Sequence, residues 1–149
     1  LMLTKLLVIF HVLGASVWVG GHIVLLVVTI PSARRRGEVA PIREFEAAFS
    51  RVGLVALLVQ VATGFALASR WVGEWRSILS SPNSAAHLVL TKLGLLALIV
   101  GLGTHASRRI VPGLTIQTLP RFVRHAWLVT GLSVALVICG VSVRFGGLL

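Results

Sequence analysis

The sequence has few charged residues and a single cysteine. Asp, Glu, Lys and Arg together make up 12% of its 149 residues, while 56% are hydrophobic. In soluble domains about a quarter of all residues are charged, so this composition excludes an ordinary soluble protein. Cys139 lies inside an apolar run and has no second cysteine to pair with, so cysteine usage does not identify the compartment. The sequence also shows no low-complexity segment and no lipidation signal.

Four long apolar runs account for the hydrophobic composition. Each is near or above the length that crosses a bilayer, and they are Leu3–Ile30, Phe49–Trp71, Ala85–Gly103 and Ala126–Val143. We therefore predict one transmembrane domain over residues 1–149, with spans at about 3–30, 47–71, 85–110 and 120–145. An even number of spans with short connections favours antiparallel neighbours. The expected fold is all-α, an integral membrane four-helix up-down bundle.

The basic residues lie at the ends of the spans. The net charge is +10, but no basic face with interleaved aromatics is present, so we do not expect nucleic acid as a partner. Cytoplasmic loops of membrane proteins are rich in Lys and Arg. The loop between spans 2 and 3 holds two arginines, whereas the first and third loops hold four each, namely Arg34, Arg35, Arg36 and Arg43, and Arg108, Arg109, Arg121 and Arg124. These two loops are predicted to be cytoplasmic, with both termini on the outer side.

Histidines recur inside or at the ends of the spans. His11 and His22 are eleven residues apart, which places them within about 20° of each other on one helix face and about 16 Å apart along it. The predicted topology gathers His22, His105 and His125 on the cytoplasmic side, from three different helices. It leaves His11 in the outer third, with His87 above it.

Lys92 is a second unusual residue, about two turns into the third span and near the depth of His11. Ionisable groups inside a membrane are functional candidates by default. Neutral imidazoles are common metal ligands. Gly20 and Gly21, just before His22, would leave room for a flat macrocycle or for a close neighbouring helix.

Several stretches resemble a known family. They are "HVLGASVWVGGHI", "FEAAFSRVGLVALLVQVATGFALA", "TKLGLLALIVGLGTHASRRIVPGL" and "GVSVRFGGL". Their order is similar to that of the copper-resistance D (CopD) family of bacterial inner-membrane proteins, in its short single-domain form. The resemblance implies a four-helix domain in the bacterial inner membrane, so that the outer side of the predicted topology is the periplasm, and a link to copper homeostasis. Its motifs match at His11, Trp18, Gly20, Gly21, Lys92, Arg109 and Pro112, and the short form is also similar at His22, Glu46, Gln60, His105, His125 and Arg144.

The chain departs from a copper-import pattern, because Cu(I) transport sites favour soft Met and Cys ligands. The sequence has one Met and one Cys, so a methionine ladder is absent. A weaker resemblance links the chain to HemJ-type protoporphyrinogen oxidases. That resemblance implies bound haem, a functional histidine in the first helix and a functional lysine in the third, places that His11 and Lys92 occupy.

The leading hypothesis is an integral membrane protein that binds b-type haem, for electron transfer or redox chemistry in the membrane. An inner site would use His22 with His105 or His125 as axial ligands of the iron. An outer site would use His11 with His87, and Lys92 would pair with a haem propionate or a quinone. One haem and two haems are both compatible with these positions.

Two other hypotheses use the same histidines. A copper-binding or copper-translocating protein would use His22, His105 and His125 as an inner ligand set, with His11 as a further metal ligand. A cofactor-free accessory subunit of a membrane complex would use them for hydrogen bonds between helices. The expected partners are the lipid bilayer and either a quinone or a redox protein. The sequence assigns no enzymatic reaction and leaves open whether the chain forms an oligomer.

Overall fold

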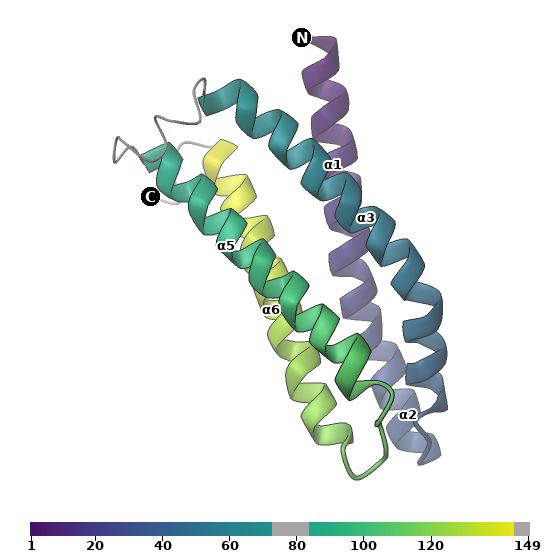
Figure 1. Cartoon of the computed structure of the whole chain (residues 1–149). Coiled ribbons are helices and arrows are strands. Elements are labelled where there is room, and N and C mark those ends of the chain that lie inside the picture. Colours follow the sequence, from purple (N-terminus) through teal and green to yellow (C-terminus); the bar gives the residue numbers. More distant parts are fainter. Residues whose placement is uncertain (73–83, 145–149) are drawn as a thin grey trace.

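The computed structural model describes the backbone of residues 1–72 and 84–144 and the side chains of residues 1–70 and 89–142. Within this part of the chain every regular element is a helix, which confirms the all-α prediction. The long helices alternate in direction along the bundle (Figure 1). The α-helices are α1 (Met2–Val24), α2 (Ile30–Arg36), α3 (Ala40–Val72), α5 (Ser84–His105) and α6 (Leu119–Arg144).

Four helices of the described residues are long and apolar enough to cross a membrane, which confirms the predicted membrane bundle. They are Met2–Arg36, Ala40–Arg70, Val89–Ile110 and Leu119–Ser142. Large apolar side chains are exposed along their length, with Val27 66% and Val55 62% accessible. Such faces are suited to lipid rather than to water. The protein is therefore a multi-pass membrane protein.

Two spans contain a π-helical turn near their ends. Leu25–Thr29 joins α1 to α2, and Ala106–Ile110 continues α5. Pro31 lies at the start of α2, directly after the π-helical turn, and the helix continues through it although Pro31 has no N–H to donate to the preceding turn. The first span consequently runs past the expected end at residue 30. It stops at Gly37, whose φ of 67° is the left-handed conformation that glycine adopts most easily.

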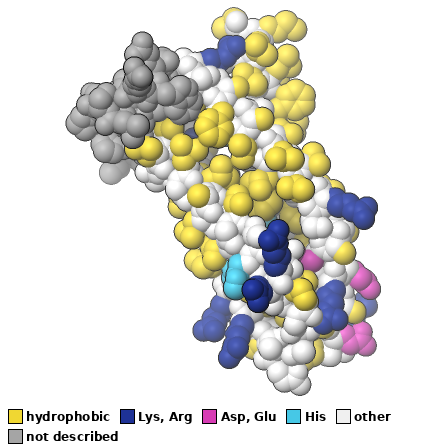
Figure 2. All heavy atoms as spheres, in the orientation of Figure 1, with side chains coloured by type: hydrophobic (Ala, Val, Ile, Leu, Met, Phe, Trp, Pro, Cys, Tyr) yellow, Lys and Arg dark blue, Asp and Glu magenta, His cyan; other side chains and the backbone are white. Residues whose placement is uncertain are grey.

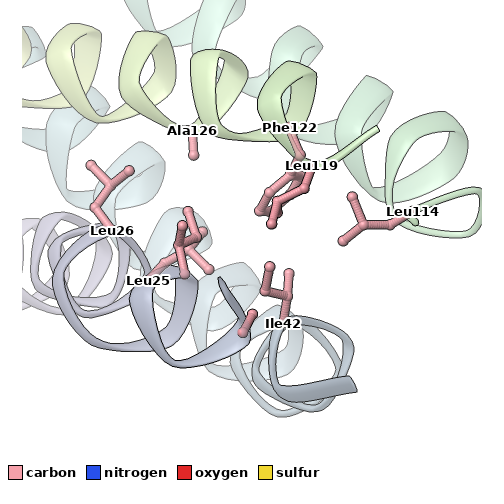
Figure 3. Close-up of a cluster of buried hydrophobic side chains, with 9 residues drawn as sticks. Leu25, Leu26, Ile42, Leu114, Leu119, Phe122 and Ala126 are labelled. Atoms are coloured by element: carbon pink, nitrogen blue, oxygen red, sulfur yellow. The ribbon is translucent and has the colours of Figure 1, made fainter. Parts of the chain in front are cut away.

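The bundle consists of two helix pairs. α1 packs most extensively against α3, α5 packs against α6, and α1 also contacts α6. A buried core joins the pairs where α2 lies, and its side chains converge from α3, α6 and the first π-helical turn (Figure 3). Its members are Leu25, Leu26, Ile30, Ala33, Ile42, Leu114, Leu119, Phe122 and Ala126. We call this end of the bundle the basic end.

The charges gather at the basic end. Figure 2 shows most Lys and Arg side chains of the visible face near it, with apolar side chains over the rest. Arg43 at the start of α3 donates a hydrogen bond of 2.8 Å to the backbone oxygen of Leu114. Ile42 beside it has no exposed surface. This burial explains why α3 begins at Ala40, seven residues before the span expected from hydropathy.

Candidate functional site

His22 lies on α1 with its ring between aromatic side chains. Its Nδ1 atom lies 2.8 Å from the backbone oxygen of Trp18, one turn earlier. A carbonyl oxygen only accepts hydrogen bonds, so Nδ1 carries the proton and Nε2 keeps its lone pair. The centroids of the Trp18 and Phe49 rings lie 4.8 and 5.8 Å from that of His22. His22 therefore keeps one nitrogen that can bind a metal, in surroundings provided by α1 and α3.

Phe49 of α3 packs directly over Gly21 of α1. A Cβ atom added at Gly21 would overlap the Phe49 ring, whereas one added at Gly20 would meet nothing within 4 Å. Phe45 stacks on Phe49 with 5.4 Å between ring centroids and 16° between planes. The two glycines were expected to leave room for either a macrocycle or a neighbouring helix. Gly21 leaves room for the neighbouring helix, and of the two only Gly20 faces open space.

Trp18 connects three helices near His22. Its Nε1–H donates a hydrogen bond of 3.0 Å to Ser133 Oγ of α6. Ser133 is buried and donates in turn to the backbone oxygen of Val129 at 2.8 Å. The Trp18 ring also lies 6.4 Å from that of Phe49 on α3. Trp18 thus fixes the position of the helix that carries His22.

His105 and His125 lie side by side on α5 and α6. Their ring centroids are 6.1 Å apart, with 43° between the planes. His125 Nε2 lies 2.9 Å from the backbone oxygen of Leu102, so Nε2 carries the proton and Nδ1 keeps the lone pair. His105 is exposed and His125 is half-buried. Of the three histidines predicted at one depth, the structure brings these two together, and the ring contacts of His22 are with Trp18 and Phe49.

His11 joins α1 to α3 in the half of the bundle away from the basic end. Its Nδ1 lies 2.9 Å from Thr63 Oγ1. The Thr63 hydroxyl donates its own hydrogen to the backbone oxygen of Val59, so His11 is the donor and its Nε2 keeps the lone pair. A Cβ added at Gly64 would lie 3.3 Å from His11 Cε1, so this glycine gives the ring its space. Thr63 was not among the predicted site residues, although a hydroxyl inside an apolar span is a known hydrogen-bond partner across helices.

Lys92 of α5 is half-buried and lies against α6. A Cβ added at Gly140 would be 3.6 Å from its Nζ. Among the described residues, the ammonium group has no hydrogen-bond or ion-pair partner. The predicted pairing of Lys92 with a haem propionate or a quinone stays a prediction.

The predicted roles of His87 and of a three-histidine metal site stay predictions. His87 belongs to α5, but its side chain lies outside the described residues. The part of the chain with described side chains contains no group of three or more His, Cys, Asp or Glu residues that could hold a metal ion. A two-imidazole site at His105 and His125 is the ligand arrangement that this part offers for a small ion.

Comparison with known proteins identifies the family. The family described as copper resistance protein D matches residues 43–143, a range that begins in α3 and leaves α1 outside. No curated protein and no solved structure matches the chain. The matched range is about two thirds of the sequence and includes Lys92, His105 and His125. The chain therefore belongs to the copper resistance protein D family, as its sequence motifs predicted.

Proposed function

We propose that this membrane protein binds copper through His105 and His125 and serves copper resistance. The observation that carries this proposal is the 6.1 Å between the two ring centroids. Metal–imidazole bonds are about 2 Å long. Two such bonds, together with the distance from each bound nitrogen to the centroid of its ring, add up to about 6 Å. The centroid separation is therefore that of two imidazoles that share one ion, which they would bind by turning their unprotonated nitrogens toward each other.

The surroundings of the pair support a metal ligand. His125 Nε2–H donates a hydrogen bond to the Leu102 carbonyl, and metal-binding histidines are commonly oriented by such a bond from the nitrogen that does not bind the metal. Imidazole is a suitable ligand for copper. The neighbouring cations Arg108, Arg109, Arg121 and Arg124 are exposed, so solvent screens their repulsion of a bound cation.

Copper analysis of purified protein tests the proposal. The protein, stripped with a chelator, would be incubated with copper, freed of excess ion and analysed for copper per chain. We expect His105→Ala and His125→Ala each to lose most of the bound copper, because each removes one of two ligands. His11→Gln is the control and should keep it. Unchanged copper in His125→Ala would contradict this assignment.

A b-type haem bound by His22 is the second candidate. The observation in its favour is that the Nδ1–H of His22 is held by the Trp18 carbonyl, which leaves Nε2 for an axial bond. Gly20 leaves open space on the same helix. The visible spectrum of the purified protein separates the candidates: a Soret band that disappears in His22→Ala supports haem, and bound copper without that band supports the first proposal. A protein with neither cofactor would favour the accessory subunit.

We also propose that the chain lies in a bacterial inner membrane with both termini in the periplasm. The family is consistent with this location, and the orientation rests on the arginine-rich first and third loops. Reporter fusions at Gly37 and Asn83 should report opposite sides, cytoplasmic and periplasmic respectively. The same side for both would contradict four alternating spans.

A further inference from the structure

The arginines that join α5 to α6 form one exposed basic patch. We call them the third-loop arginines, and they are Arg108, Arg109, Arg121 and Arg124. The first two follow His105 within about one helical turn, and the last two precede His125 within about one turn. The ring centroids of these histidines are 6.1 Å apart, and the π-helical turn that carries the first two arginines also contacts α6. Both helices of the pair therefore contribute to one patch at the basic end.

The second helix pair contains no acidic residue to neutralise this patch. Residues 84–144 include neither Asp nor Glu, whereas Glu38, Glu44 and Glu46 lie in or beside the first arginine-rich loop. Among the described side chains, the third-loop arginines have no ion-pair partner. Arg121 also lies in the first turn of α6, where the helix dipole disfavours a cation. A bound anion would remove both the mutual repulsion and this dipole cost.

The exposed face of α6 continues from the arginines into apolar side chains. Arg121, Arg124 and Leu128 are three or four residues apart and share one face with Trp127. Trp127 is 62% exposed and Leu128 51% exposed, and Ile138 is exposed further along the helix. Tryptophan is enriched at the headgroup level of membranes. Guanidinium groups, an indole ring and apolar side chains thus follow one another in the order of a phospholipid's phosphate, interfacial region and acyl chains.

From this acid-free patch and the apolar face that continues it, we propose that the third-loop arginines bind the headgroup of an anionic phospholipid, with its acyl chains along Trp127 and Leu128. Guanidinium groups match phosphate oxygens with paired, charge-assisted hydrogen bonds. Basic sites between transmembrane helices are suited to anionic headgroups. A soluble acidic partner would match the arginines but not the apolar face. The lipid site does not depend on the copper proposal, since no imidazole nitrogen takes part.

Quenching of tryptophan fluorescence by phospholipids with brominated acyl chains tests this proposal on the purified protein in detergent micelles. The probes are phosphatidylglycerol and phosphatidylcholine with the same brominated chains, so that they differ in headgroup charge. The contribution of Trp127, one of four tryptophans, is obtained by subtracting the signal of Trp127→Phe. We expect phosphatidylglycerol to quench Trp127 at a concentration lower by about tenfold or more, because several arginines attract its charge.

Two double variants locate the site. Arg121→Gln with Arg124→Gln should lose most of the preference for phosphatidylglycerol. Arg34→Gln with Arg35→Gln is the matched control, because it removes two exposed arginines from the first loop at the same end of the bundle, and it should keep the preference. Circular dichroism checks that both fold, and Arg121→Lys with Arg124→Lys, which keeps the charge, should retain most of the preference.

Three results would overturn the proposal. The first is equal quenching of Trp127 by the two lipids in the parent protein. The second is an equal loss of preference in the two glutamine double variants, which would indicate a response to net charge rather than a site. The third is displacement of brominated phosphatidylglycerol by inorganic phosphate or by polyglutamate, which would identify a soluble anion as the ligand.

Discussion

Adjacent glycines of α1 provide a sharp test of how α1 meets α3. Gly20 and Gly21 are neighbours in one helix, but a Cβ added at Gly21 would overlap the Phe49 ring, and one added at Gly20 would meet nothing within 4 Å. Alanine in place of an interior helical glycine contributes about 0.5–1 kcal/mol to stability. We therefore expect Gly20→Ala to stabilise the protein by up to about 1 kcal/mol.

The same substitution at Gly21 should have the opposite sign. The Phe49 ring cannot move aside freely, because Phe45 stacks on it and the Trp18 and His22 rings lie against it. Overpacking of this kind costs about 1–3 kcal/mol, which exceeds the gain in helix propensity. Gly21→Ala should therefore be less stable than Gly20→Ala by about 1–3 kcal/mol.

Unfolding of the two variants in detergent, followed by circular dichroism, measures this difference. A compensating variant serves as the control: Phe49→Leu shortens the side chain over Gly21, so Gly21→Ala should cost less in that background than in the parent. Equal stability of Gly20→Ala and Gly21→Ala would refute the close packing of Phe49 on α1.

Three smaller effects follow from hydrogen bonds between elements. Trp18→Phe and Ser133→Ala should each lower the free energy of unfolding by about 0.5–1.5 kcal/mol, and a double-mutant cycle should give a coupling of about 0.6 kcal/mol; no coupling would argue against the bond. Thr63→Val should lower the free energy of unfolding by about 0.5–1.5 kcal/mol, because His11 loses its hydrogen-bond acceptor. Thr63→Ser keeps a hydroxyl and should retain most of that stability in the same unfolding assay. Arg43→Met should cost at most about 1 kcal/mol, since that side chain is exposed, and a larger loss in thermal unfolding would contradict a surface contact.

Hydropathy predicted the spanning helices because a bilayer imposes a length and a composition that a sequence shows directly. It did not predict the start of α3 at Ala40. The residues between Ala40 and the expected span include Arg43 and Glu44. They are helical because Ile42 is buried in a core that contains residues of the other helix pair. Such a contact joins residues that are far apart in the sequence, and the local sign of the lead-in is Pro41, since proline is favoured in the first turn of a helix.

The candidate residues show the same division. Helical depth predicted that His22, His105 and His125 would gather at one level and that His11 and Lys92 would share another. Depth does not determine which way a side chain points around the helix axis. Because of this direction, His22 contacts Phe49 rather than a second histidine, and His11 forms a hydrogen bond with Thr63. These partners depend on how the helices are rotated against one another.

The π-helical turns have a consequence for changes in chain length. Such a turn accommodates about one residue more than an α-helical turn and leaves the flanking helix undisturbed. Deleting Val27 from Leu25–Thr29 would let the turn close into ordinary α-helix, with the faces before and after it still in phase. Deleting Val17 from the middle of α1 would instead rotate everything on one side by about 100°. The first span can thus lose a residue at its π-helical turn without turning His11 and His22 away from their partners, which makes this turn the place where a length difference is tolerated.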